Sequence, residues 1–241
     1  MQRNEMHDYV EELQGFGTHG IPRGRGAAVL RRFTSHGMRE NAKLRSTKLL
    51  RPWSRRRAEK VAASKRPLLL HLGSGTHYLD GWVNLDIVGM GADVYWDLRD
   101  PLPFADNSAD GIFCEHTLEH FVLVGGIGLL SECHRVLKPG ALCRFGVPDF
   151  GKYILSYAGD RTELESLRPG RPTPLLAVAE VVLAHGHRSA WDGETLSAVM
   201  ENAGFVDVGV KPWGDTAFAS NPDSISRRAE SVYAEGIKPR R

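Results

Sequence analysis

The sequence lacks a long apolar run and has few cysteines. No hydrophobic stretch approaches the roughly 20 residues that a membrane-spanning helix needs, and the start, MQRNEMHDYVEELQ, has no apolar core of the signal-peptide type. The three cysteines, Cys114, Cys133 and Cys143, form no C-x-x-C pair and fall in apolar segments. This pattern predicts a cytoplasmic protein with buried, reduced thiols, rather than a disulfide scaffold or a cysteine metal site.

Charge is nearly balanced over the whole chain but not along it. The 241 residues are 41% hydrophobic and 25% charged, as in ordinary globular proteins. Residues 1–66 carry a net charge of +10 and the remainder −8. We therefore predict a basic N-terminal extension over 1–66, partly disordered or helical, followed by one domain over 67–241. A basic extension can contact nucleic acid, but no aromatic residues interleave with its charges, so a nucleic-acid partner is not expected.

The basic residues 38–65 favour one or two helices broken at Pro52. From residue 68 onward, short apolar segments alternate with segments of helical periodicity. The predicted strands are 68–72, 83–87, 93–97, 110–115, 141–147, 205–211 and 231–238. The predicted helices are 128–137, 175–183 and a helix capped by Asp192. This alternation is typical of an α/β fold with a doubly wound, mostly parallel sheet.

Two glycine-rich turns compete as the cofactor-binding loop. GFGTHG at 15–20 matches G-x-G-x-x-G, but no strand precedes it and Pro22 follows, so the match lacks its structural context. GSGTHY at 73–78 follows a predicted strand, and only ten residues, 73–82, separate that strand from the next. A long helix under a pyrophosphate does not fit in that space. The second turn therefore favours a nucleoside without a pyrophosphate, whose ribose hydroxyls the nearby Asp86 could bind.

Five segments, in order, resemble class I S-adenosylmethionine (SAM)-dependent methyltransferases, close to the type 11 group. They are LHLGSGT, GWVNLDI, DLRDPLPFADNSADGIFCEHTLEHF, LLSECHRVLKPGALCRFGVPDF and LSAVMENAGF, within residues 68–210. The resemblance implies an enzyme with a Rossmann-like sheet of seven strands, the last antiparallel. It also implies that SAM binds at the carboxyl ends of the first four strands.

The resemblance assigns the cofactor site residue by residue. It implies contacts to the methionine part from Gly73, Ser74 and Gly75, to ribose from Asp86, to adenine from Asp97 and Leu98, and to the sulfonium side from Glu115 and His116. The chain departs from the family pattern at His71, where an acidic residue is frequent, and at His77, where a third glycine is frequent. These departures leave open a non-catalytic SAM-binding scaffold.

An oxygen or nitrogen acceptor must lose a proton, so a nearby base can assist methyl transfer. His116 is the first candidate, with a pKa near 6.5 if unperturbed, and Asp149 and His187 are the next two. The resemblance implies that the insertion at about 150–191 selects the acceptor. It favours a small molecule, sugar or lipid.

EHTLEH at 115–120 contains the zinc-peptidase pattern H-x-x-E-H, with His116 and His120 as ligands and Glu119 as base. The motif begins at the end of a predicted strand rather than within a long helix. No downstream carboxylate stands out as a third ligand. We therefore expect no metal there, and the peptidase stays as the less favoured alternative.

Overall fold

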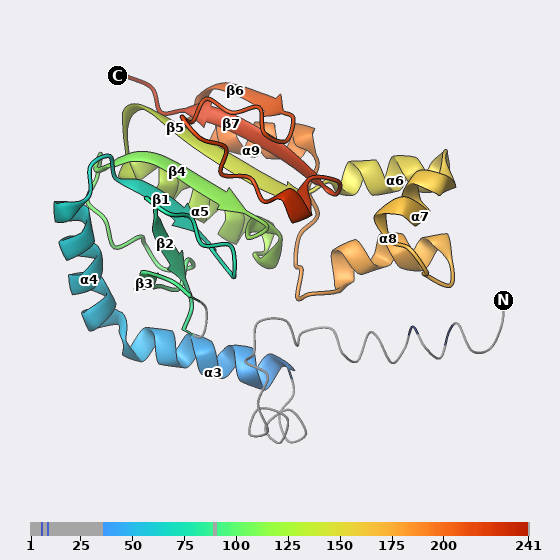
Figure 1. The fold of residues 1–241 in the computed structure, drawn as a ribbon, viewed down its shortest axis with the longest axis horizontal. Helices are drawn as coiled ribbons and strands as arrows, with labels where there is room; N and C mark the ends of the chain where they lie inside the picture. The colour runs from blue at the N-terminus through green and yellow to red at the C-terminus, as the bar shows by residue number, and fades with distance from the viewer. Residues whose placement is uncertain (1–5, 7–8, 10–35, 89–90, 241) are drawn as a thin grey trace.

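The computed structural model describes residues 6, 9, 36–88 and 91–240, and their backbone folds around one sheet (Figure 1). The strands are β1 Leu69–Leu72, β2 Val83–Asp86, β3 Val94–Tyr95, β4 Ala109–Glu115, β5 Leu137–Pro148, β6 Val206–Lys211 and β7 Ser231–Ile237. The helices are α3 His36–Leu49, α4 Arg51–Ser64, α5 Leu123–Val136, α6 Phe150–Ala158, α7 Arg161–Leu167, α8 Pro174–Leu183 and α9 Gly193–Asn202. Two 3-10 turns, η1 Leu118–His120 and η2 Ile225–Arg227, complete the described elements.

The strands lie in the order β3-β2-β1-β4-β5-β7-β6. The pairs from β3 to β5 are parallel, whereas β7 runs antiparallel to both β5 and β6. This arrangement confirms the predicted Rossmann-like sheet of seven strands with the last antiparallel. The carboxyl ends of β1, β2 and β4 meet at one edge, which is where open α/β sheets bind ligands.

One face of the sheet is covered by α5 and α9, which lie behind it in Figure 1. The predicted apolar face of α5 is buried there through Leu129, Leu130, Cys133 and Val136. The three cysteines are free and buried, as predicted. Asp192 caps α9, because its Oδ1 accepts a hydrogen bond from the backbone N–H of Thr195 at 2.8 Å.

The opposite face carries no helix between β1 and β2, because residues 73–82 form only turns. The connection between β6 and β7, residues 212–230, crosses this face instead (Figure 1). Phe218 packs its ring against Trp82, with the ring centroids 5.1 Å apart. The short link between the first two strands was predicted from the sequence, but the segment that replaces the helix was not.

The basic segment before the sheet forms two helices, α3 and α4, with Pro52 in the first turn of α4. Proline fits there because the first turn of a helix has no hydrogen-bond partner for the missing N–H. The prediction of basic helices interrupted at Pro52 is confirmed. The GFGTHG segment at 15–20 lies outside the described residues.

Helices α6, α7 and α8 follow the carboxyl end of β5 and project beyond the sheet (Figure 1). They enclose a small core of their own, built on Tyr153, Leu164, Ala177 and Val181. Within residues 36–88 and 91–240, no helix has the length and apolar character that crossing a membrane requires.

Candidate cofactor and acceptor site

The glycine turn after β1 is tied to the end of β2. The backbone N–H groups of Gly73 and Ser74 both donate to the carbonyl of Leu85, at 2.9 and 3.1 Å. The N–H of Gly75 donates to Oδ2 of Asp86 at 2.7 Å. Gly73 and Gly75 have φ angles of 68° and 55°, the left-handed region that glycine adopts without steric cost. Asp86 therefore holds the turn in place, and its other oxygen accepts the N–H of Ile87 at 2.6 Å.

The turn also meets the segment that follows β4. A Cβ atom on Gly73 would lie 2.0 Å from Oγ1 of Thr117. The hydroxyl of Ser74 is buried and has no hydrogen-bond partner among the described residues. Because buried polar atoms without partners are rare in native proteins, this hydroxyl fits a site completed by a polar ligand. The residues present thus suit the SAM that the resemblance implies.

Asp97 lies just after β3 and is engaged by a neighbouring arginine. Nε and one terminal nitrogen of Arg99 donate to its two oxygens at 2.8 and 2.7 Å, and Nζ of Lys48 lies 4.0 Å away. Burial acts to raise the pKa of Asp97, but the hydrogen bonds from Arg99 hold it below its ordinary value. Leu98 is partly buried and packs on the core. The sequence did not indicate that Asp97 would be shared with Arg99.

Glu115, the last residue of β4, directs its carboxylate toward the C-terminal part of the chain. Its Oε1 accepts hydrogen bonds from the hydroxyl of Tyr233 at 2.7 Å and from the N–H of Ser224 at 3.1 Å. Burial raises the pKa of this carboxyl. Glu115 therefore links β4 to β7 and to the segment that covers the open face.

His116 has a φ angle of 47°, an unusual conformation for a residue other than glycine. Its N–H donates to the carbonyl of Gly146 at 2.9 Å, and its Nε2 lies 2.6 Å from the hydroxyl of Ser231. Burial lowers the pKa of His116 to about 3. The value near 6.5 that an unperturbed ring would have does not apply here, because the ring is withdrawn from water. The imidazole is therefore neutral at physiological pH. Strained backbone of this kind costs about 1–3 kcal/mol and is frequent at functional sites.

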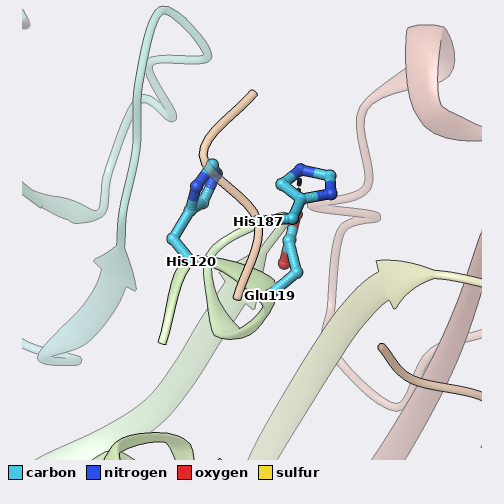
Figure 2. Close-up of side chains that lie close together, drawn as sticks. All are labelled: Glu119, His120 and His187. Carbon is cyan, nitrogen blue, oxygen red and sulfur yellow. Dashed lines mark ion pairs between the residues drawn. The ribbon is translucent and has the colours of Figure 1, made fainter. Parts of the chain in front are cut away.

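Glu119 lies close to His120 and His187 (Figure 2) and also close to His116. Its Oε1 is 3.4 Å from Nδ1 of His116 and 4.0 Å from Nε2 of His187. The rings of His120 and His187 are 5.0 Å apart between centroids. Burial raises the pKa of Glu119 to about 8, so without a bound cation its carboxyl is mostly protonated at neutral pH.

Hydrogen bonds hold the end of the insertion against η1. The N–H groups of Arg188 and Ser189 donate to the carbonyl of Glu119 at 2.6 and 3.2 Å. The hydroxyl of Ser189 donates to the carbonyl of Phe121 at 2.8 Å. These contacts bring His187 to Glu119 although the two are 68 positions apart. No sequence pattern indicated this pairing or the contact between His116 and Ser231.

Asp149, another of the catalytic candidates, caps α6 by accepting the N–H of Lys152 at 3.1 Å. Burial raises the pKa of its carboxyl. It lines a hollow of about 400 Å³ together with Lys152, Glu163 and Asp192. A smaller cavity of about 10 Å³ lies between Glu119 and His187. The structure therefore brings His116 and His187 to Glu119 and places Asp149 at a separate hollow.

Comparison with known proteins supports the resemblance. Residues 92–145 match the family described as "Methyltransferase domain". This segment includes Asp97, Glu115, His116 and Glu119. The match supports the resemblance to SAM-dependent methyltransferases over this segment of the chain. No curated protein matches the chain.

Several solved structures are similar to this chain at low sequence identity. A SAM-dependent methyltransferase from Archaeoglobus fulgidus is 16% identical, with a TM-score of 0.47 over 81% of this chain and 94% of that one. A 16S rRNA (adenine(1408)-N(1))-methyltransferase from Catenulisporales acidiphilia is 17% identical, with a TM-score of 0.40 over 77% and 91%. Phosphoethanolamine N-methyltransferase 2 from Haemonchus contortus is 14% identical, with a TM-score of 0.42 over 73% and 49%. The acceptors named for the rRNA and phosphoethanolamine enzymes differ, and we take neither as the acceptor of this protein.

Proposed function

We propose that this protein transfers the methyl group of SAM to an oxygen or nitrogen atom of a small-molecule, sugar or lipid acceptor. The observation that carries the proposal is the Gly73–Gly75 turn, hydrogen-bonded to Asp86 and in contact with Thr117. It joins the carboxyl ends of β1, β2 and β4 at the edge where such sheets bind ligands. The unpartnered hydroxyl of Ser74 supplies a polar group for the ligand.

In this proposal SAM supplies an electrophilic methyl group on its sulfonium. The turn and Ser74 bind the methionine part, Asp86 binds the ribose, and Asp97 with Leu98 contacts the adenine. Glu115 and His116 form the wall beside the sulfonium. His116 is neutral because its pKa is about 3, so it is available as a proton acceptor, although a weak one.

The acceptor is proposed to bind near the insertion over about 150–191. The hollow of about 400 Å³ lined by Asp149, Lys152 and Asp192 is within the size range of small-molecule sites. Its lining mixes charged groups of both signs, which suits a polar organic acceptor. Asp149 lines this hollow and could receive a proton, whereas His187, the other candidate base of this region, lines the smaller cavity beside Glu119.

The two departures from the family pattern have structural roles. His71 is buried in β1, where its Nδ1 lies 3.0 Å from Oδ1 of Asn84. Nε2 of His77 lies 3.0 Å from the carbonyl of Pro222. The His71 ring thus links β1 to β2, and the His77 ring links the glycine turn to the β6–β7 connection.

The H-x-x-E-H peptidase hypothesis is weakened because the motif includes His116, whose backbone is left-handed, and a 3-10 turn, and does not lie within a helix.

Calorimetry with SAM and with S-adenosylhomocysteine tests the cofactor assignment. We expect one site per chain for each ligand. Asp86→Ala should lower the affinity at least tenfold, because each charge-assisted hydrogen bond is worth about 1.5–3 kcal/mol. Asp80→Ala removes an exposed carboxylate near the same turn and should bind as the parent does. Parental affinity in Asp86→Ala would contradict the assignment.

Transfer from methyl-labelled SAM into a fractionated cell extract tests the acceptor class. We expect label in the small-molecule, sugar or lipid fraction. Label confined to RNA or protein would contradict the proposed acceptor while leaving the SAM site in place.

A further inference from the structure

Three side chains near the end of β4 can offer ligand atoms to one cation. One carboxylate oxygen of Glu119 and one ring nitrogen each of His120 and His187 all lie within 4.8 Å of one another. Figure 2 shows the carboxylate of Glu119 beneath the ring of His187, with His120 beside them. Glu119 and His120 come from η1, whereas His187 comes from the segment after α8. This set differs from the sequence motif, because Glu119, the base of the motif, becomes a ligand and His187 takes the place of His116.

Glu119 is the strongest sign that something binds here. Its side chain is 2% exposed, and neither carboxylate oxygen has a hydrogen-bond partner among the described residues. Leaving a buried polar group unpaired is costly, so such a group calls for a ligand, a water or an ion. The cavity of about 10 Å³ between Glu119 and His187 is close to the least volume that holds one water-sized occupant.

His187 is oriented as a metal ligand. Its Nδ1 lies 2.5 Å from the backbone carbonyl of Val181, and a carbonyl can only accept, so the proton is assigned to Nδ1. The lone pair is then on Nε2, the nitrogen that lies 4.0 Å from Oε1 of Glu119. Metal-binding histidines commonly donate their other N–H to a backbone carbonyl, which fixes the ring and its tautomer.

We propose that Glu119, His120 and His187 bind one divalent transition-metal ion, with Zn²⁺ as the ion that fits best. Two imidazoles and one carboxylate are a ligand set that zinc uses in catalytic sites. The same set disfavours Mg²⁺ and Ca²⁺, which bind oxygen ligands.

The geometry needs only a small adjustment to close on an ion. In a tetrahedral zinc site, two ligand atoms at 2.0–2.1 Å from the metal lie about 3.4 Å apart. Nε2 of His187 and Oε1 of Glu119 are 4.0 Å apart, so these two atoms must approach each other by only about 0.6 Å. The side chain of His120 is exposed, so an ion can reach the three ligand atoms from that side.

Three protein ligands leave at least one coordination position for water or substrate. The site adjoins the cofactor turn through Thr117, two residues before Glu119. Its cavity is also lined by Phe150 and Trp191, from the region proposed to select the acceptor.

Metal titration of the full-length, chelator-treated protein tests the site. We expect Zn²⁺ to bind at one per chain by calorimetry and Mg²⁺ to give no binding at the same concentrations. His187→Ala and Glu119→Gln should each weaken zinc binding more than about 100-fold, because even outer-shell partners contribute about 10–100-fold. His185→Ala removes a histidine of the same loop outside the proposed ligand set and should keep the parental affinity.

SAM binding, measured on each variant, shows that the fold is retained and separates the two hypotheses. Parent protein that binds SAM but no zinc would overturn the metal site and leave the proposed function. Zinc binding without SAM binding would leave the metal site and overturn the proposed function. Parental zinc affinity in His187→Ala would overturn the ligand assignment.

Discussion

At the scale of single residues, His71 couples folding to pH. Burial lowers its pKa to about 4 in the folded chain, against 6.5 in the unfolded chain. A lowered folded pKa means that the unfolded state takes up the proton first as pH falls. The contribution of the neutral His71 ring to the free energy of unfolding is therefore fully present above pH 6.5 and is lost as the pH falls from 6.5 to 4. At about 1.4 kcal/mol per pKa unit, the loss approaches about 3 kcal/mol.

His71→Gln isolates this contribution, because glutamine does not titrate in this range. Urea unfolding at pH 7 and pH 4.5 should show a smaller loss of stability in the variant than in the parent. The comparison is needed because burial also lowers the pKa of His116 and of His187, with the same sign of effect. Equal losses in parent and variant would contradict a neutral, buried His71.

Gly73 is a position where a single methyl group should remove cofactor binding. Gly73→Ala would place its Cβ 2.0 Å from the Thr117 hydroxyl, at a φ of 68°. Gly81 has a φ of 84° but open space around its added Cβ, so Gly81→Ala meets only backbone strain, about 1 kcal/mol. We expect Gly73→Ala to abolish SAM binding in calorimetry and Gly81→Ala to retain it. Loss in both would mean that backbone strain alone, not contact with Thr117, decides the effect.

At the scale of elements, the β6–β7 connection is held to the sheet by a buried arginine. Arg144, in β5, binds Asp223 at 2.7 and 2.6 Å and Glu235 at 3.1 Å, with no exposed surface. Arg144→Met would leave the two carboxylates buried without a cation. Breaking a buried pair in this way costs about 3–5 kcal/mol.

Chemical unfolding measures that cost. Arg57→Met, a surface change on α4, should alter stability by no more than about 0.5 kcal/mol. Equal stability of Arg144→Met and the parent would show that the connection is held by its apolar contacts, such as Phe218 on Trp82, rather than by the ion pairs.

The sequence allowed prediction of the elements whose signal is local. The apolar spacing of α5 and the cap at Asp192 depend on residues within one or two turns, so both were predictable. Burial of Arg144 depends on partners 79 and 91 positions away, and no local pattern encodes them. In the candidate site, too, only the local features could be predicted from the sequence. The glycine turn and Asp86 are close together in the sequence, whereas the contact of His187 with Glu119 forms only when the insertion folds back.

At the scale of the whole molecule, helix α3 before the sheet contacts segments of the proposed cofactor site. The hydroxyl of Thr47, in α3, accepts the N–H of Val88 at 2.9 Å, just after β2. Nζ of Lys48 lies 4.0 Å from Asp97. The part of the extension that touches the sheet therefore begins no later than residue 47, and it contacts the segments proposed to bind ribose and adenine.

Two deletions of different length separate this contribution from that of the GFGTHG segment. Removing residues 1–30 should leave SAM affinity unchanged, because the Gly73–Gly75 turn is the one framed by strands. Removing residues 1–50 also removes the contacts of Thr47 with Val88 and of Lys48 with Asp97. Each contact is worth about 1 kcal/mol, so this deletion should weaken SAM binding about tenfold or more. Calorimetry on both proteins measures the difference. A large loss already in the shorter deletion would mean that SAM depends on GFGTHG, and the choice of the Gly73–Gly75 turn would be wrong.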